Sequence, residues 1–130
     1  MQRQLMLAAA ALMLVSCAPS ARPVKRFGSV IGLRAEKAEE YKRLHAAAWS
    51  GVLKMISECN IRNYSIFHKD GYLFSYFEYH GTDFEADMAR MAADPITQEW
   101  WKHCIPCQEP LPTRAPGEWW ADMEEVFHHD

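Results

Sequence analysis

A tyrosine, a histidine and a tryptophan follow one another at four-residue steps, as Tyr41, His45 and Trp49. Residues four apart lie on the same side of a helix, so these three side chains would project together. The imidazole has an ordinary pKa of about 6.5, and it can give or take a proton near neutral pH. The triplet therefore predicts either an acid–base site or a hydrogen-bonded core histidine among apolar neighbours.

Further aromatic and amide groups favour a pocket for a small polar molecule with an apolar face. Asn63 and Tyr64 could bring an amide and a phenol to the helix that carries His45, and Trp100 stands next to Trp101. The pair at residues 119–120 repeats the tryptophan theme, and five tryptophans in 130 residues exceed what a small core needs. Flat aromatic rings commonly stack on the apolar face of a pyranose, so the pattern indicates a sugar site.

The elements that must position these groups alternate between strand and helix periods. Residues 25–33 read as a strand, because Phe27, Ile31 and Leu33 recur at odd positions. From Ala35 to about Cys59 the apolar residues recur at three- and four-residue steps, which predicts an amphipathic helix with a weak point near Gly51.

The second half of the chain repeats this order. Residues 61–68 and 72–80 read as two strands, joined by a hairpin at Lys69-Asp70-Gly71. Residues 82–85 form a capping box that opens a helix to about Ala93, and Asp94-Pro95 opens another to about Cys104. The proline-rich residues 105–118 are expected to form a long surface loop, and residues 119–127 a last strand.

The order β-α-β-β-α-β predicts an α+β fold of the ferredoxin-like kind, a four-stranded antiparallel sheet with helices on one face. The other face would then lack a cover. The third strand carries too many aromatic residues to leave in water, so we expect a homodimer in which two sheets meet face to face. These residues are Tyr72, Phe74, Phe77 and Tyr79.

The first residues look like a targeting segment. Leu5 to Val15 is almost wholly apolar but shorter than the roughly 20 residues that span a bilayer. The run ends in a sequence that resembles a lipobox, with Cys17 as the lipidated residue. We therefore expect a lipoprotein signal peptide at 1–16, a lipidated tether at 17–24 and the folded domain at 25–130. This predicts an exported protein anchored at the periplasmic face of the outer membrane, or a cytoplasmic protein if the signal is not used.

Composition and spacing limit the other function classes. The formal net charge of −3 does not suit a nucleic-acid binder, which normally presents a basic face. Cys104 and Cys107 have Cys-x-x-Cys spacing, but they follow a predicted helix instead of opening one, so a local disulfide or two free thiols is expected before redox catalysis. Histidines at 128–129 make a metal site conceivable, although tail histidines are usually solvated.

Four segments in order, residues 41–45, 62–66, 98–102 and 124–127, resemble the L-rhamnose mutarotases, and the similarity runs from Lys25 to the C-terminus. The resemblance implies a dimeric α+β barrel and an isomerase that needs no cofactor. One departure is Ser50-Gly51, where many members have proline and glutamate, and this change leaves the substrate less defined than the reaction. The resemblance also implies roles for five residues: general acid for His45, and sugar contacts for Tyr41, Tyr64, Trp100 and Trp101.

The reaction expected from this resemblance interconverts the α and β anomers of a 6-deoxy sugar by acid–base catalysis. L-Rhamnose and L-fucose both fit a pocket this aromatic, because their methyl group needs an apolar contact. The first alternative is a lipid-anchored sugar-binding module without catalysis. The second, ranked below it, is a thiol redox protein that uses Cys104 and Cys107. Nucleic acid is not an expected partner, and the only membrane contact expected is the lipid anchor.

Overall fold

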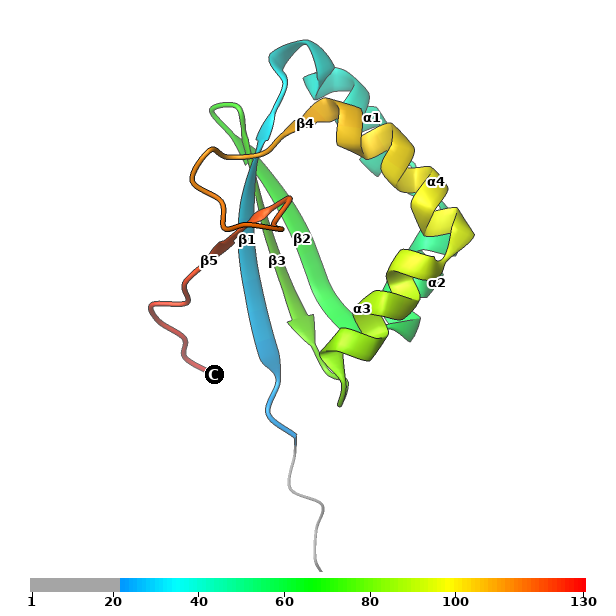
Figure 1. Ribbon diagram of the computed structural model, residues 1–130, viewed down its shortest axis with the longest axis vertical. Coiled ribbons are helices and arrows are strands. Elements are labelled where there is room, and N and C mark those ends of the chain that lie inside the picture. Colours follow the sequence, from blue (N-terminus) through cyan, green and yellow to red (C-terminus); the bar gives the residue numbers. More distant parts are fainter. Residues whose placement is uncertain (1–21) are drawn as a thin grey trace, which may run out of the picture.

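A computed structural model describes residues 22–130, so the predicted signal peptide and Cys17 lie outside the described residues. Strands and helices alternate along the chain in the predicted order (Figure 1). The elements are β1 (Lys25–Leu33), η1 (Ala35–Lys37), α1 (Ala38–Ala46), α2 (Ser50–Glu58), β2 (Ile61–Lys69), β3 (Tyr72–Tyr79), α3 (Phe84–Ala93), α4 (Pro95–Cys104), η2 (Ile105–Cys107), β4 (Gln108–Glu109) and β5 (Ala121–Met123).

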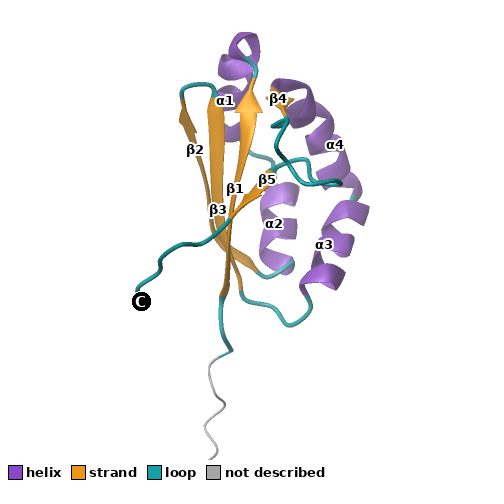
Figure 2. Ribbon diagram, turned by 60° about the vertical axis from the view of Figure 1, so that its left-hand side comes forward, coloured by secondary structure: helices purple, strands orange, loops and turns teal. Residues whose placement is uncertain are grey.

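The sheet is antiparallel throughout and has the order β2-β3-β1-β4, with β5 also paired to β1. β4 joins the end of β1 at Gly32 and Leu33, and β5 joins its middle at residues 28–30. The long strands curl, and the four α-helices lie on one side of the sheet (Figures 1 and 2). The predicted α+β, ferredoxin-like class is confirmed, in the form of a curled half-barrel.

The β2–β3 hairpin turns where Asp70 and Gly71 predicted it. Both residues have positive φ, 51° and 79°, as a tight hairpin turn of the type favoured by Asp-Gly requires. Near the start of β2 the register of its pairing with β3 shifts between Arg62 and Ser65, and Asn63 in this stretch has a φ of 51°. This irregularity changes which face of the sheet the neighbouring side chains reach.

The helix predicted from Ala35 to Cys59 is wrong as a single element. α1 ends at Ala46, and Trp49 has extended backbone angles before α2 begins at Ser50. The break therefore precedes Gly51 instead of falling on it. Gly51 serves a packing role, because a Cβ there would lie 2.8 Å from Cδ1 of Ile96 on α4. Its missing side chain lets α2 approach α4 closely.

The two later helices begin where side-chain caps predicted, with one change. Asp94 caps α4 through the backbone N–H of Thr97, at 2.7 Å, as expected for Asp-Pro. The N-cap of α3 is Asp83, which accepts from the N–H of Ala86 at 3.0 Å, and not Thr82 as the capping-box pattern predicted.

The C-terminal segment departs most from prediction. Residues 105–118 are not only a surface loop, because they include η2 and β4, and Gln108 is buried. The predicted last strand shrinks to β5, and beyond it Val126 and Phe127 are exposed. Arg26 ties this tail to β1, since its Nε lies 2.8 Å from the Glu125 carboxylate.

The core lies between the sheet and the helices. Ile31, Leu33 and Leu73 meet helix residues there, and the cluster from the helical side contains Tyr41, Val52, Trp100, Cys104 and Cys107. No helix among residues 22–130 is long and apolar enough to cross a membrane.

Third-strand aromatics divide between the two faces, because strand side chains alternate. Tyr79 is buried on the helix side and Phe77 stacks on Phe27 there, with ring centroids 5.0 Å apart. Tyr72 and Phe74 alternate with these residues and lie on the uncovered face of the sheet. Only part of the predicted aromatic set is therefore on the uncovered face.

Candidate active site

His45 sits on α1 one turn after Tyr41, and its two ring nitrogens have different surroundings. Nδ1 lies 2.9 Å from the backbone oxygen of Tyr41. A carbonyl oxygen can only accept, so Nδ1 carries the proton and Nε2 of the neutral ring keeps a lone pair. Tyr41 stacks on the imidazole at 4.1 Å between ring centroids, and Trp100 meets it edge-on at 5.2 Å.

Burial lowers the pKa of His45 below its usual 6.5, and the hydrogen bond to the Tyr41 carbonyl acts in the opposite direction. The ring is therefore mostly neutral at pH 7. Its free nitrogen, Nε2, is a base at rest that becomes an acid once it has taken up a proton.

Two phenols were predicted to share the site with His45: Tyr41 contacts its ring, whereas Tyr64 meets Phe77 of β3, at 5.6 Å between ring centroids. Tyr41 is buried, which raises its pKa, while the amide of Gln108 lowers it. The whole Tyr64 side chain is 44% exposed, and its strand, β2, lies at the edge of the sheet. Its hydroxyl group is nevertheless surrounded by protein, and this burial raises its pKa to about 12. Both hydroxyls therefore stay protonated at neutral pH and can donate hydrogen bonds.

The adjacent tryptophans of α4 have different environments. Trp100 is only 6% exposed and packs between His45 and Trp49, whereas Trp101 is 37% exposed. Trp49 keeps its place beside Trp100, at 5.3 Å between ring centroids, although the helix that was predicted to align it with His45 is broken. The structure thus brings together Tyr41, His45, Trp49 and Trp100, and it does not place Trp101 in a ring contact with them.

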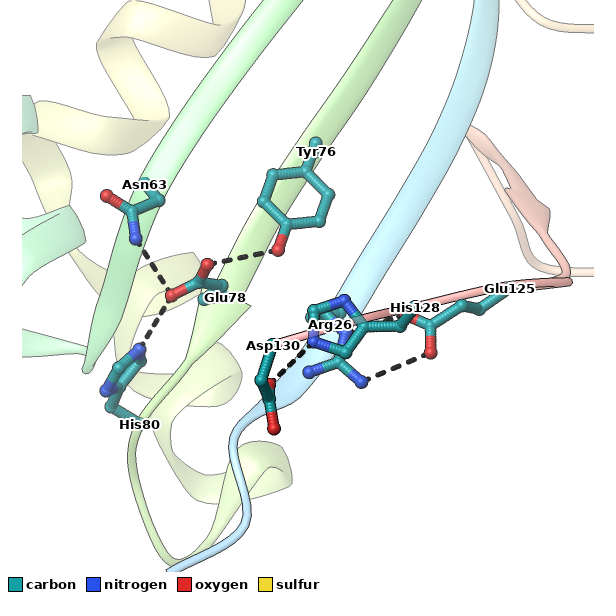
Figure 3. A network of polar contacts seen from close by, with 8 residues as sticks. All are labelled: Arg26, Asn63, Tyr76, Glu78, His80, Glu125, His128 and Asp130. Atoms are coloured by element: carbon teal, nitrogen blue, oxygen red, sulfur yellow. Dashed lines mark hydrogen bonds and ion pairs between the residues drawn. The ribbon is translucent and has the colours of Figure 1, made fainter.

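The sequence suggested that Asn63 and Tyr64 reach the same pocket, but the structure separates them. Its amide donates to the Glu78 carboxylate at 2.8 Å, and Glu78 also contacts the Tyr76 hydroxyl and the His80 ring at 3.0 Å each (Figure 3). These contacts lower the pKa of the Glu78 carboxyl group, and the contact with His80 has the largest effect. Asn63 and Tyr64 lie on different faces of the sheet, because successive side chains of a strand point to opposite sides.

Polar groups on the sheet were missed in the sequence analysis. Ser29 and Ser75 share a hydrogen bond of 2.6 Å between their hydroxyl oxygens, in register on β1 and β3. Ser29 lies between Phe27 and Ile31 in the inward-facing alternation, which is the signal that could have revealed it. The helix-facing side of the sheet therefore offers hydroxyl groups as well as apolar surface.

Thiol redox chemistry finds no support in the surroundings of the Cys-x-x-Cys pair. Cys104 and Cys107 are buried free thiols, and burial raises the pKa of Cys104 to about 12. A redox-active thiol needs the opposite shift, toward the thiolate. Within residues 22–130, no group of three or more side chains is placed to hold a metal ion, and His128 contacts Asp130 at 2.9 Å.

Comparison with known proteins identifies the family. A sequence model described as L-rhamnose mutarotase matches residues 26–129. The chain belongs to the L-rhamnose mutarotase family. It is 32% identical to the L-rhamnose mutarotase of Listeria monocytogenes serotype 4b (strain F2365), over 81% of this chain and 98% of that protein. It is 30% identical to that of Bacillus subtilis (strain 168), over 82% and 100%.

Solved structures agree on the fold. A crystal structure of L-rhamnose mutarotase from Formosa agariphila superposes with a TM-score of 0.63 at 21% identity, and covers 82% of this chain and 99% of that one. Tetracenomycin F2 cyclase from Streptomyces glaucescens, a type-II polyketide cyclase, gives 0.62 at 13% identity. Family membership confirms the predicted isomerase class, while the roles of His45, Tyr41, Tyr64, Trp100 and Trp101 stay predictions.

Proposed function

We propose that this member of the L-rhamnose mutarotase family interconverts the α and β anomers of L-rhamnose, or of a related 6-deoxy sugar such as L-fucose. The observation that carries the proposal is the state of His45. Its Nδ1 is held by the Tyr41 carbonyl, its Nε2 is left free, and aromatic rings flank it. A neutral imidazole held in this way suits proton transfer without any redox or metal chemistry.

The proton count of the reaction fits a single imidazole. Nε2 of His45 takes the proton of the anomeric hydroxyl and delivers it to the ring oxygen. The bond from the anomeric carbon to the ring oxygen breaks, its electron pair stays on the ring oxygen, and the former hydroxyl becomes the carbonyl. Both oxygens are attached to the same carbon, so one nitrogen can serve them in turn. Rotation about the next carbon–carbon bond and the reverse steps give the other anomer.

The remaining residues hold the sugar. Tyr41 and Tyr64 donate hydrogen bonds to its hydroxyl groups, and Trp101 offers an exposed ring for its apolar face. Trp100 meets the His45 ring edge-on, so it holds the imidazole in position beside the sugar. Because mutarotation already proceeds in water, positioned acid–base catalysis worth roughly 10²- to 10⁴-fold is sufficient.

The test is anomer exchange measured by saturation-transfer NMR with residues 18–130. We expect acceleration with L-rhamnose and with L-fucose. D-Glucose, which has a hydroxymethyl group in place of the methyl group, serves as the comparison sugar and should exchange more slowly. A folded protein that binds these sugars without accelerating exchange would contradict the proposal and identify a binding module.

The assembly proposed for this enzyme is a homodimer, in which a second copy covers the free face of the sheet. Phe67 is 65% exposed and Tyr72 46% on that face, and Met123 of β5 extends the apolar surface. A matching sheet would remove these rings from water, which monomeric proteins rarely leave exposed as a contiguous patch.

Export with a lipid on Cys17 is likewise a proposal, supported by the apolar run and the lipobox-like ending in the sequence. It would place anomer exchange where glycosidases release sugars and transporters take them up. Cell fractionation tests it: the full chain should be in the membrane fraction, and a Cys17→Ala variant should not be lipidated. An unlipidated wild-type protein in the soluble cytoplasmic fraction would overturn the proposal.

A further inference from the structure

Asp122 of β5 adds a carboxylate to the inner, helix-facing side of the sheet. It is paired in register with Ser29 of β1, and residues directly opposite each other in an antiparallel pair project from the same face. Ser29 in turn shares a hydrogen bond of 2.6 Å with Ser75 of β3. Neighbouring strands therefore present a row of polar groups, made of Asp122, Ser29 and Ser75, which we call the polar row.

The surroundings of β5 agree with this orientation. Trp120 packs against the buried core cluster, and residues two apart in an extended chain lie on the same face, so Asp122 shares the inner face with Trp120. Asp122 is exposed, since its strand pairs with β1 alone. Burial and then Glu118 raise the pKa of the Asp122 carboxyl group above its ordinary 3.8, but a side chain this exposed stays ionised at neutral pH.

The polar row lies next to the rings that surround His45. Ile31 and Leu73 follow the two serines by two residues on the same face of β1 and β3, so the two pairs are about 7 Å apart along the strands. Ile31 and Leu73 belong to the same packed cluster as Tyr41 and Trp100, and these two rings flank the imidazole. A monosaccharide beside His45 can therefore reach the polar row.

A sugar in this space needs hydrogen-bond acceptors as well as donors. Each of its hydroxyl groups carries one hydrogen, and a donor that loses water without gaining a partner weakens binding. The protonated phenol of Tyr41 donates to sugar oxygens, and Nε2 of His45 takes only the anomeric proton. An ionised carboxylate can only accept, and its two oxygens can serve two neighbouring hydroxyl groups.

We propose that Asp122 binds the sugar, with its carboxylate accepting hydrogen bonds from hydroxyl groups on the side of the pyranose away from His45. It is a substrate-binding residue and takes no part in the proton transfer. The serine pair stands beside it, and only one of the two serine hydroxyl hydrogens is used within the pair, which leaves the other to donate to the sugar. The inference rests on the proposed mutarotase function for its choice of substrate.

Removing the charge at constant size tests the inference. In Asp122→Asn we expect KM for L-rhamnose to rise about 10-fold, the effect of one hydrogen bond to a charged group, with kcat within about twofold. The matched control is Asp70→Asn in the β2–β3 turn, where asparagine suits the positive φ equally well, and it should leave KM unchanged. An unchanged KM in Asp122→Asn would overturn the inference.

Sugars that lack one hydroxyl group separate a direct contact from an effect of the charge at a distance. Kd values from NMR titration are compared for L-rhamnose and its monodeoxy derivatives. At least one derivative should bind the wild type about 10-fold more weakly than L-rhamnose does, and Asp122→Asn should change the Kd of that derivative by less than about twofold. If the substitution weakens the binding of every sugar by the same factor, the proposed contact is wrong.

Binding and exchange are measured separately on the same protein samples. A wild type that binds L-rhamnose without accelerating exchange, and that loses affinity in Asp122→Asn, contradicts the proposed function and supports the sugar contact. A wild type that accelerates exchange, with the same Kd and KM in Asp122→Asn, supports the function and overturns the contact. Should Asp122→Asn not fold, Asp122→Ser replaces it, with the same expected losses.

Discussion

At the scale of single residues, His45 is prepared for proton transfer by its own helix. The Tyr41 carbonyl one turn earlier holds Nδ1, and partial burial against Tyr41 and Trp100 disfavours the charged ring. The same carbonyl therefore fixes the tautomer and leaves Nε2 available.

The pH dependence of catalysis follows from the lowered pKa of His45. Because the neutral ring takes the first proton, kcat/KM for L-rhamnose should rise with pH up to the His45 pKa, below 6.5, and then stay flat to about pH 8. Saturation-transfer NMR between pH 4.5 and 8, with the uncatalysed rate subtracted, measures this. A rate that instead falls as pH rises through that pKa would mean that the imidazolium form starts the reaction.

Residue spacing predicted part of this site. Tyr41 and His45 lie together because four residues complete about one turn of any helix, whatever surrounds it. Trp101 was grouped with Trp100, but neighbours on a helix point about 100° apart, and only Trp100 faces the core. Asn63 was misplaced because adjacent residues of a strand point to opposite faces, so it could not share one pocket with Tyr64. Gln108 was missed because its burial depends on a tertiary contact with Trp119.

At the scale of elements, β1 organises the site, because β3 pairs with one edge and β4 and β5 share the other. The approach of β4 is close at Gly32, where a Cβ would lie only 2.6 Å from the Glu109 backbone oxygen. Gly28, opposite β5, would bring a Cβ to 3.3 Å from the end of the flexible Met123 side chain.

Gly32→Ala should therefore displace β4 and with it Gln108. We expect a loss of roughly 1–3 kcal/mol in the free energy of unfolding, as for overpacked sites. Gly28→Ala is the matched control on the same strand, where a methyl group can move aside, so its loss should be smaller. Urea denaturation of both variants measures the difference, and equal losses would contradict the close approach at β4.

Removing the cap of α4 should weaken the helix that carries Trp100. Asp94→Ala loses the bond to the Thr97 N–H and should cost about 1 kcal/mol of stability. Asp83→Ala removes the equivalent cap of α3 and should cost a similar amount. Thermal unfolding reads both losses, but only Asp94→Ala should also slow anomer exchange, since α3 carries none of the site residues.

Element order could be predicted from the sequence because the long segments have clear periods and strong turn signals, such as Asp70-Gly71 and Asp94. The weak point predicted near Gly51 anticipated the break between α1 and α2 but not its place, since the apolar period continues across Trp49. The short strand β4 also escaped prediction, and β5 covers only residues 121–123 of the strand predicted at 119–127. They exist through pairing with β1, and two or three residues carry too little pattern.

At the scale of the whole molecule, the helices cover one face of the sheet and leave the other open (Figure 2). The tail beyond β5 runs on the side away from the helices, where Arg26 pairs with Glu125 (Figures 1 and 3). Exposed Phe67, Tyr72 and Phe127 therefore belong to the side of the molecule that the proposed dimer would bury.

A charge in the middle of this face should disrupt the proposed dimer. Phe67→Glu places a carboxylate among the rings and is expected to give a monomer at concentrations where the wild type is dimeric. His68→Glu, on the next residue of β2 and the opposite face, should remain a dimer. Sedimentation velocity at several concentrations decides, and a wild-type protein that is monomeric throughout would contradict the proposed assembly.

The central claim is that His45 moves the proton in an anomer exchange. The most direct measurement is the exchange rate between the anomeric protons of L-rhamnose with wild type and with His45→Ala, each checked for folding. We predict acceleration by the wild type and a loss of roughly 10²-fold or more in the variant, the contribution of a positioned acid–base group. A folded His45→Ala protein that accelerates exchange as well as the wild type would contradict the account.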